Sequence, residues 1–198
     1  AELALIELGV ATKSLTPAQA AERLEGLRFA WRGDDLELDI LHRLGQFYIE
    51  AKNVKSGLTV MASALRLYPK SPQSSIIRDE MVSAFSNVFV GDLSTNVSPL
   101  ESLSLYEQFN DLMPQGEERN DIVYNLAERL VAIDLLDQAA SLLEDQVQHH
   151  REGQSKARIG TRLAAIRLLD HKPSAALNAL EISQVENLPI SLQNERLL

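Results

Sequence analysis

The sequence predicts an all-α protein, a solenoid of about five helix pairs, and three observations favour this fold class. Ser/Thr-Pro pairs at Thr16, Ser71 and Ser98 open segments of helical apolar spacing, and Gln19 and Glu101 complete two capping boxes. Sustained apolar-polar alternation and Asn-Gly or Asp-Gly turns are missing from the 198-residue sequence, which argues against strands. Small residues recur at nearly constant steps, which indicates a helical repeat.

The recurring small residues give the repeat its period. The steps between them are 37, 45, 37 and 37 residues, and they are Ala20, Gly57, Ser102, Ala139 and Ala176. The long step places eight extra residues near 89–98, a segment whose charged residue is Asp92. We interpret this segment as a surface insertion, because loops tolerate added length, and a recognition loop is the alternative.

Segment 38–71 resembles the tetratricopeptide repeat, a pair of antiparallel helices A and B. The resemblance rests on the order of Leu44-Gly45, Tyr48, Gly57, Met61, Ala64 and Pro69. It extends over the chain as a single solenoid, 1–198, with repeats at about 1–34, 38–71, 74–114, 120–153 and 157–190, and with 191–198 starting a further helix. It implies a right-handed α-α superhelix whose A helices line a concave groove. Arg167, Gln146 and Ser183 depart from the small or apolar residues of the repeat.

The two ends of the sequence suggest a piece of a larger protein. The chain begins at Ala1 and ends at Leu198, within a stretch that reads as another helix. The repeats are similar to the helical-repeat region of large bacterial tetratricopeptide proteins. Because the residues after Leu188 are not polar enough to cap a solenoid, we expect an exposed apolar edge there, which self-association would cover.

Charge and composition narrow the classes of partner. Lys and Arg number 19 against 28 Asp and Glu, a net charge of −9 that argues against nucleic-acid and anionic-membrane binding. No apolar run reaches the length of a membrane span. The absence of cysteine excludes disulfides, thiolate metal sites and a cysteine nucleophile. Cytoplasm and bacterial periplasm fit this composition equally well.

The motifs of catalysis and of cofactor or metal binding are missing. The sequence has no Gly-rich phosphate loop, no Gly-x-Ser-x-Gly elbow and no His-Glu-x-x-His pair. Neighbouring His149 and His150 would point about 100° apart on a helix, so we interpret them as a solvated helix end. We therefore expect no enzyme activity in this chain, no cofactor and no metal. Trp31, the single tryptophan, is interpreted as a plug between helix pairs, with a partner anchor as the alternative.

The remaining candidate site is the concave groove, which would bind a protein or peptide partner. The repeat alignment places these residues in it: Asp39, His42, Gln46, Asp79, Tyr124, Asn125, Glu128, Arg158 and Arg162. Asn125, Arg158 and Arg162 match half of the carboxylate clamp known in some tetratricopeptide domains, but Asp79 stands in the other half. We therefore expect a polar or mixed-charge peptide rather than an acidic tail. For any one of these residues, a merely solvated helix face is the alternative.

Three functional hypotheses follow, and the first is preferred. It is a protein-interaction scaffold that holds a partner segment or packs within a larger assembly, for which the cell envelope is one setting. The second is a docking or regulatory arm of an enzyme whose catalytic part lies elsewhere in the protein. The third is an RNA-binding helical repeat of the pentatricopeptide type, against which the net charge of −9 argues.

Overall fold

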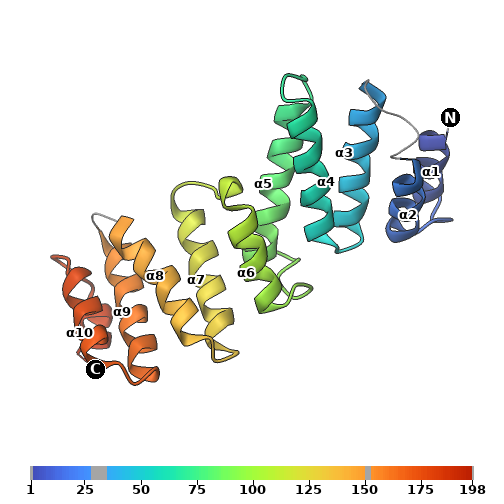
Figure 1. Ribbon diagram of the computed structural model, residues 1–198. Helices are drawn as coiled ribbons and strands as arrows, with labels where there is room; N and C mark the ends of the chain where they lie inside the picture. Colours follow the sequence, from blue (N-terminus) through green and yellow to red (C-terminus); the bar gives the residue numbers. More distant parts are fainter. Residues whose placement is uncertain (1, 28–34, 150–152, 198) are drawn as a thin grey trace. The chain divides into compact units, whose positions relative to one another are not determined.

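The protein is a stack of helices that pack in sequence order. The computed structural model describes residues 2–27, 35–149 and 153–197, which contain eleven α-helices, a short 3₁₀ helix and no strand (Figure 1). Contacts divide the chain into two compact units, an N-terminal unit of residues 1–96 and 105–113 and a C-terminal unit of residues 97–104 and 114–198. The predicted all-α solenoid is thus confirmed, and each unit is described separately.

The two units contain successive helices of the chain. The N-terminal unit holds α1 (Glu2–Ala11), α2 (Pro17–Leu27), α3 (Asp35–Glu50), α4 (Val54–Leu67), α5 (Ser74–Val90) and η1 (Asn110–Leu112). The C-terminal unit holds α7 (Glu117–Val131), α8 (Leu136–His149), α9 (Gln154–Leu169), α10 (Pro173–Ile182) and α11 (Ile190–Glu195). Helix α6 (Pro99–Gln108) has residues in both. From α1 to α5 and from α7 to α10, each helix packs on the next.

The recurring small residues share one structural position. Each is the fourth residue of an even-numbered helix, and each donates its N–H to the carbonyl of the residue just before that helix. All five are buried, namely Ala20, Gly57, Ser102, Ala139 and Ala176. A small residue is needed where two helices cross closely, and the constant register explains the sequence period.

The crossing of α3 and α4 shows how close this approach is. A Cβ atom on Gly57 would lie 2.6 Å from Ile49 Cγ1 and 2.9 Å from the carbonyl oxygen of Gly45. A Cβ atom on Gly45 would lie 2.5 Å from Met61 Cγ. Because van der Waals contact needs about 3.5–4 Å, a methyl group at either position would force the facing atoms to shift.

The turns that join odd to even helices also repeat. Lys52, Asp134 and His171 each lie two residues before an even helix and have a positive φ of 66°, 63° and 56°. The next residue donates its N–H back to the fifth residue before it, for example from Asn53 to Tyr48 and from Leu135 to Leu130. This is the Schellman arrangement, which satisfies the last carbonyls of a helix.

The predicted helix starts are correct at two of three positions. Thr16 and Gln19 exchange hydrogen bonds of 2.9 and 3.3 Å as a capping box, and Ser98 Oγ accepts the N–H of Glu101 at 3.2 Å. The start at Ser71 is wrong, since α5 begins at Ser74. Residues 69–73 form turns and a bend instead, and Ser74 Oγ donates across them to the carbonyl of Tyr68 at 2.7 Å.

The segment near 89–98 is anchored by apolar side chains. Helix α5 runs on to Val90, and after it Leu93 and Val97 are 7% and 3% exposed. Within the C-terminal unit, the Arg129 guanidinium donates to the carbonyl of Val97. With Phe89 at 2% exposure, three apolar side chains of the segment are buried, so it is more than a surface insertion.

The three residues of the C-terminal unit that depart from the repeat pattern are accommodated in different ways. Arg167, 12% exposed, pairs with Asp137 and Glu144 of α8, each at 3.1 Å. Gln146 is 1% exposed, and neither atom of its amide meets a hydrogen-bond partner among the described residues. Ser183 is fully buried and donates to the carbonyl of Ala179 at 2.6 Å. Trp31 and His150 lie outside the described residues.

Candidate functional site

In the N-terminal unit, polar side chains of α3 and α5 form a hydrogen-bonded cluster. His42 Nε2 lies 2.7 Å from Glu80 Oε2, and Gln46 Nε2 donates to both carboxylate oxygens of Glu80, at 3.1 and 3.0 Å. These groups are partly buried, with the His42 side chain 18% exposed. Two of the residues predicted for the groove, His42 and Gln46, therefore lie together and share the carboxylate of Glu80.

Arg43 connects this cluster to α1. Its Nη1 donates to Gln46 Oε1 at 2.8 Å, its Nε lies 3.3 Å from Glu7 Oε1, and its guanidinium carbon lies 4.3 Å from the centre of the Phe47 ring. A cation held over an aromatic face and beside a carboxylate is constrained in position. The cluster is thus an ordered polar surface rather than a set of independent solvated side chains.

Two recesses flank the cluster. The larger, of about 550 Å³, lies between α1, α3 and α5 and is lined by Leu3, Glu7, Asp39, His42, Arg43, Gln46, Gln73 and Ile76. The smaller, of about 340 Å³, lies between α3 and α5. Asp39 accepts from Gln73 Nε2 at 3.0 Å. Asp79, also predicted for the groove, is exposed and lines neither recess, whereas its neighbour Glu80 lines the smaller one.

In the C-terminal unit, a bidentate ion pair joins α7 to α9. Arg162 Nε and Nη2 donate to the two carboxylate oxygens of Glu128 at 2.5 and 2.7 Å. The hydrogen bond that Arg162 donates to Glu128 raises the pKa of Arg162, and partial burial opposes this rise. The sequence placed both residues in the groove, but their contact neutralises the charge that each was expected to offer a partner.

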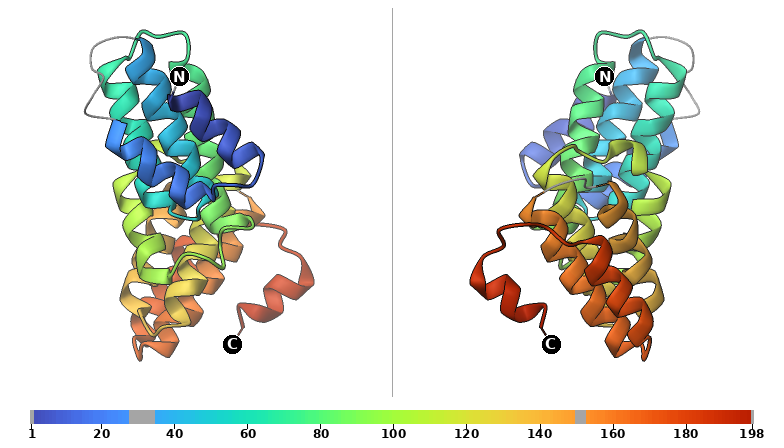
Figure 2. Two further views of the ribbon diagram at one scale, coloured as in Figure 1. Left: turned by 90° about the vertical axis from the view of Figure 1, so that its right-hand side faces the viewer. Right: turned by 90° about the vertical axis from the view of Figure 1, so that its left-hand side faces the viewer.

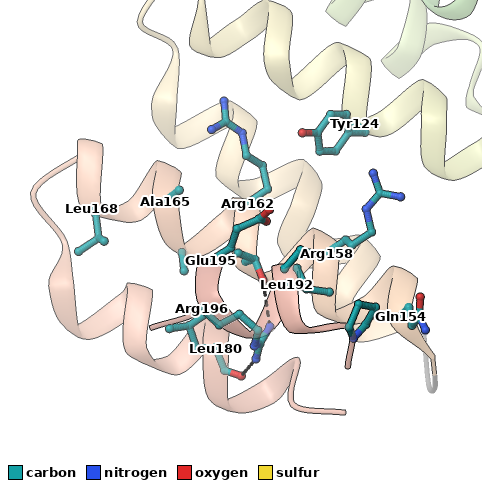
Figure 3. A pocket seen from close by; sticks show the side chains of 14 residues that line it. Tyr124, Gln154, Arg158, Arg162, Ala165, Leu168, Leu180, Leu192, Glu195 and Arg196 are labelled. Atoms are coloured by element: carbon teal, nitrogen blue, oxygen red, sulfur yellow. Dashed lines mark hydrogen bonds between the residues drawn. The ribbon is translucent and has the colours of Figure 1, made fainter. Parts of the chain in front are cut away.

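Arg162 of this ion pair lines a recess of about 660 Å³ (Figure 3). Its walls combine basic, aromatic and apolar groups of α7, α9, α10 and α11: Tyr124, Gln154, Arg158, Thr161, Arg162, Ala164, Ala165, Leu168, Leu180, Pro189, Ser191, Leu192, Glu195 and Arg196. Of the predicted groove residues, Tyr124, Arg158 and Arg162 line it, and Arg158 is exposed. Asn125 is half-buried on α7 and lines neither this recess nor a smaller one of about 200 Å³ between α7 and α9.

The C-terminal helix α11 forms one side of this recess. Within the C-terminal unit it lies to one side of the other helices (Figure 2, red) and packs on α9. Leu192 is its buried residue, at 6% exposure. Just after the helix, Arg196 Nη1 donates to the carbonyl of Ala157, to Thr161 Oγ1 and to Ser183 Oγ at 3.0, 3.1 and 3.2 Å. Arg196 Nη2 donates to the carbonyl of Leu180 at 2.6 Å.

Sequence reasoning missed Arg196 and its acceptors. Arg196 belongs to the expected further helix, and Ser183 is a departure from a small residue, but the two are 13 residues apart in sequence and their contact belongs to no motif. Burial without a carboxylate partner lowers the pKa of Arg196. A buried serine at a helix-crossing position was the one available signal of a polar site.

Within the described ranges, no group of three acidic or histidine side chains is placed to hold a metal ion. The helices that the structure describes also include none that is long and apolar enough to cross a membrane. What the two units present is recessed surface on the odd-numbered helices, lined by paired charges, amides and a few apolar side chains.

Comparisons with known proteins add little to this description. Neither a protein-family model nor a curated protein matches the sequence. Among solved structures, the chain is similar to the crystal structure of BtubC (BKLC) from P. vanneervenii, at 16% sequence identity, with 90% of this chain and 75% of that chain covered. The TM-score of 0.36 is low, and no conclusion about fold or function rests on this likeness.

Proposed function

We propose that this protein is a protein-interaction scaffold that binds a partner segment along its odd-numbered helices. The observation that supports this proposal most directly is that each unit carries a recess of 550–660 Å³ on those helices. The recesses combine fixed hydrogen-bonding groups with apolar patches, as peptide-binding grooves do. The register of small residues supports a second part of the proposal, that the helix pairs are tetratricopeptide repeats.

Arg158 is the groove residue best suited to a test. It is exposed and lines two recesses of the C-terminal unit, of about 660 and 200 Å³. Changing Arg162 as well would break its ion pair with Glu128 and confuse binding with stability. Arg66, exposed on α4 and outside the recesses described above, provides a matched charge reversal.

The experiment selects ligands from random sequences, so the partner need not be identified first. A library of random peptides displayed on phage is enriched on the full chain, and the affinities of the winning peptides are measured by fluorescence polarisation. We expect Arg158→Glu to weaken binding of these peptides at least tenfold and Arg66→Glu to leave it within twofold. Winning peptides that bind both variants as tightly as the wild type would contradict the groove as the site.

We also propose that exposed apolar side chains near the C-terminal end of the chain, on α9, α10 and α11, pair with a second copy of the chain. Leu177 and Leu169 are 63% and 56% exposed at this end of the C-terminal unit, and Ile182 is 37% exposed. Light scattering over a range of concentrations tests this pairing, which Leu177→Glu should abolish because a charge cannot be buried unpaired. A strict monomer at high concentration would contradict it.

A further inference from the structure

The cluster of acceptors around Arg196 is built by α9 and α10 and would exist without α11. Thr161 Oγ1 donates its own proton to the carbonyl of Ala157 at 2.7 Å, and Ser183 Oγ donates to that of Ala179 at 2.6 Å. Because both protons are used within the helices, both hydroxyl oxygens present lone pairs outward. Gly160 makes room for this arrangement, since a Cβ there would collide with Ser183 Oγ.

The chemistry of these acceptors selects an arginine. They are two hydroxyls and two carbonyls, and the carbonyl of Leu180 lies in the last turn of α10, where the helix dipole favours a cation. Three acceptors contact one guanidinium nitrogen and the fourth contacts another. A planar fork spans such a set, whereas the single ammonium of lysine does not.

The segment that occupies the site is poorly held by anything else. Helix α11 has six residues, which is too short to be stable alone, and residues 184–189 join it to α10 without regular structure. Its two inward groups are Leu192 and Arg196, four residues apart and thus on one helix face. The recess of about 660 Å³ extends beyond α11 along α9 to Leu168 and, on α7, to Tyr124 (Figure 3).

We propose that the Arg196 acceptors and the adjoining recess form the binding site for a partner helix carrying a leucine and an arginine four residues later, and that α11 is its intramolecular competitor. This inference deepens the proposed scaffold function and rests on it for the external partner. A longer helix of the same pattern would fill more of the recess than α11 does and would displace it. The affinity for such a partner is reduced by the fraction of molecules in which α11 is docked.

The test empties the site within the full chain. The variant Leu192→Ala with Arg196→Ala removes the two inward groups of α11 and leaves every acceptor in place. A labelled peptide with the sequence of residues 184–197 is then added, and its binding is followed by fluorescence polarisation. We expect this peptide to bind the emptied chain at least tenfold more tightly than it binds the wild-type chain. Removing the charge-assisted anchor of α11 should raise the fraction of molecules with an empty site by about that factor.

Four comparisons identify the anchor. Asn194→Ala, on an exposed residue of α11, should bind the peptide as the wild type does. Adding Thr161→Val to the emptied chain should reduce peptide binding, and a peptide with glutamine at the arginine position should lose at least tenfold. Hydrogen exchange of the α11 amides should be faster in Arg196→Ala than in Asn194→Ala, while circular dichroism shows that the stack remains folded.

The outcomes separate this inference from the scaffold proposal. Equal peptide binding by the emptied and wild-type chains, or equal binding of the arginine and glutamine peptides, would overturn the inference. Library peptides that lose affinity in Arg158→Glu but do not compete with the 184–197 peptide would also overturn it and would leave the scaffold function in place. A library without groove ligands would contradict the scaffold function, whereas the peptide added in trans tests the acceptor site independently.

Discussion

The contact between α3 and α4 predicts opposite effects for the same substitution at two glycines of the N-terminal unit. Gly26 lies in α2, where a Cβ atom would have no contact within 4 Å, so Gly26→Ala changes only the helix propensity of this position. At Gly57 a Cβ would lie 2.9 Å from the carbonyl oxygen of Gly45, a backbone atom that moves only if the helices separate. The substitution should therefore stabilise the unit at Gly26 and destabilise it at Gly57.

The magnitudes follow from two opposing contributions. Replacing glycine by alanine inside a helix stabilises it by up to about 1 kcal/mol, mainly through the unfolded chain, at either position. Overpacking at Gly57 costs about 1–3 kcal/mol. We expect Gly26→Ala to stabilise the unit by about 0.5–1 kcal/mol and Gly57→Ala to destabilise it by about 1–2 kcal/mol.

Urea unfolding followed by circular dichroism measures both changes, with thermal unfolding as a second readout. For a unit of this size, 1 kcal/mol corresponds to a shift of about 4–8 °C in Tm. Because the effect on the unfolded chain is shared, the difference between the two variants isolates the helix contact. If Gly57→Ala stabilised the protein as much as Gly26→Ala, the close crossing of α3 and α4 would be refuted.

Three further substitutions test the C-terminal unit. Gln146→Met should stabilise it by about 1 kcal/mol in urea unfolding, because the buried amide lacks a partner among the described residues and the replacement has a similar shape; destabilisation would reveal a missed partner. Asp134→Gly should stabilise the unit by roughly 0.5 kcal/mol and raise its Tm slightly, because φ is 63° there and glycine adopts a positive φ without the strain that other residues incur. An unchanged or lower Tm would contradict this. The hydrogen bond from Lys172 lowers the pKa of Asp137, so the stabilisation that Asp137 contributes is present above its unfolded pKa of about 3.9 and is lost as pH falls through the lowered value. Urea midpoints of wild type and Asp137→Asn should accordingly differ at pH 7 and converge toward pH 2, and a difference independent of pH would contradict the ion pair.

Features that depend on local sequence could be predicted. The small residue at the fourth position of each even helix follows from one requirement, the close crossing of helices, repeated at a fixed period. The capping box at Thr16 is equally local, since both partners lie within four residues. The start of α5 was misjudged because a serine followed by proline is also a turn signal, and the Ser74 hydroxyl stabilises that turn.

The groove could be predicted only as a set of helix faces. Asp79 and Glu80 are neighbours in sequence but project about 100° apart on α5, so an alignment uncertain by one residue exchanges an exposed carboxylate for one in the His42 cluster. The partner of Arg162 is 34 residues away on another helix, and no local pattern identifies it. The docking of α11 depends on hydroxyl orientations at Thr161 and Ser183, which only the folded helices determine.

The ion pair between Glu128 and Arg162 determines which charges of the C-terminal unit are available to a partner. Glu128 and Arg162 satisfy each other with two short hydrogen bonds, so a ligand gains little from either unless it breaks the pair. Arg158 remains as an exposed cation in a recess that also contains Tyr124 and the apolar wall at Leu168. Recognition there would rest on one accessible cation, an aromatic face and the arginine-selective acceptors near Ser183. Such a combination favours a helix with an acidic group near its arginine. This preference depends on the charges in the recess and not on the net charge of −9, which counts the whole chain.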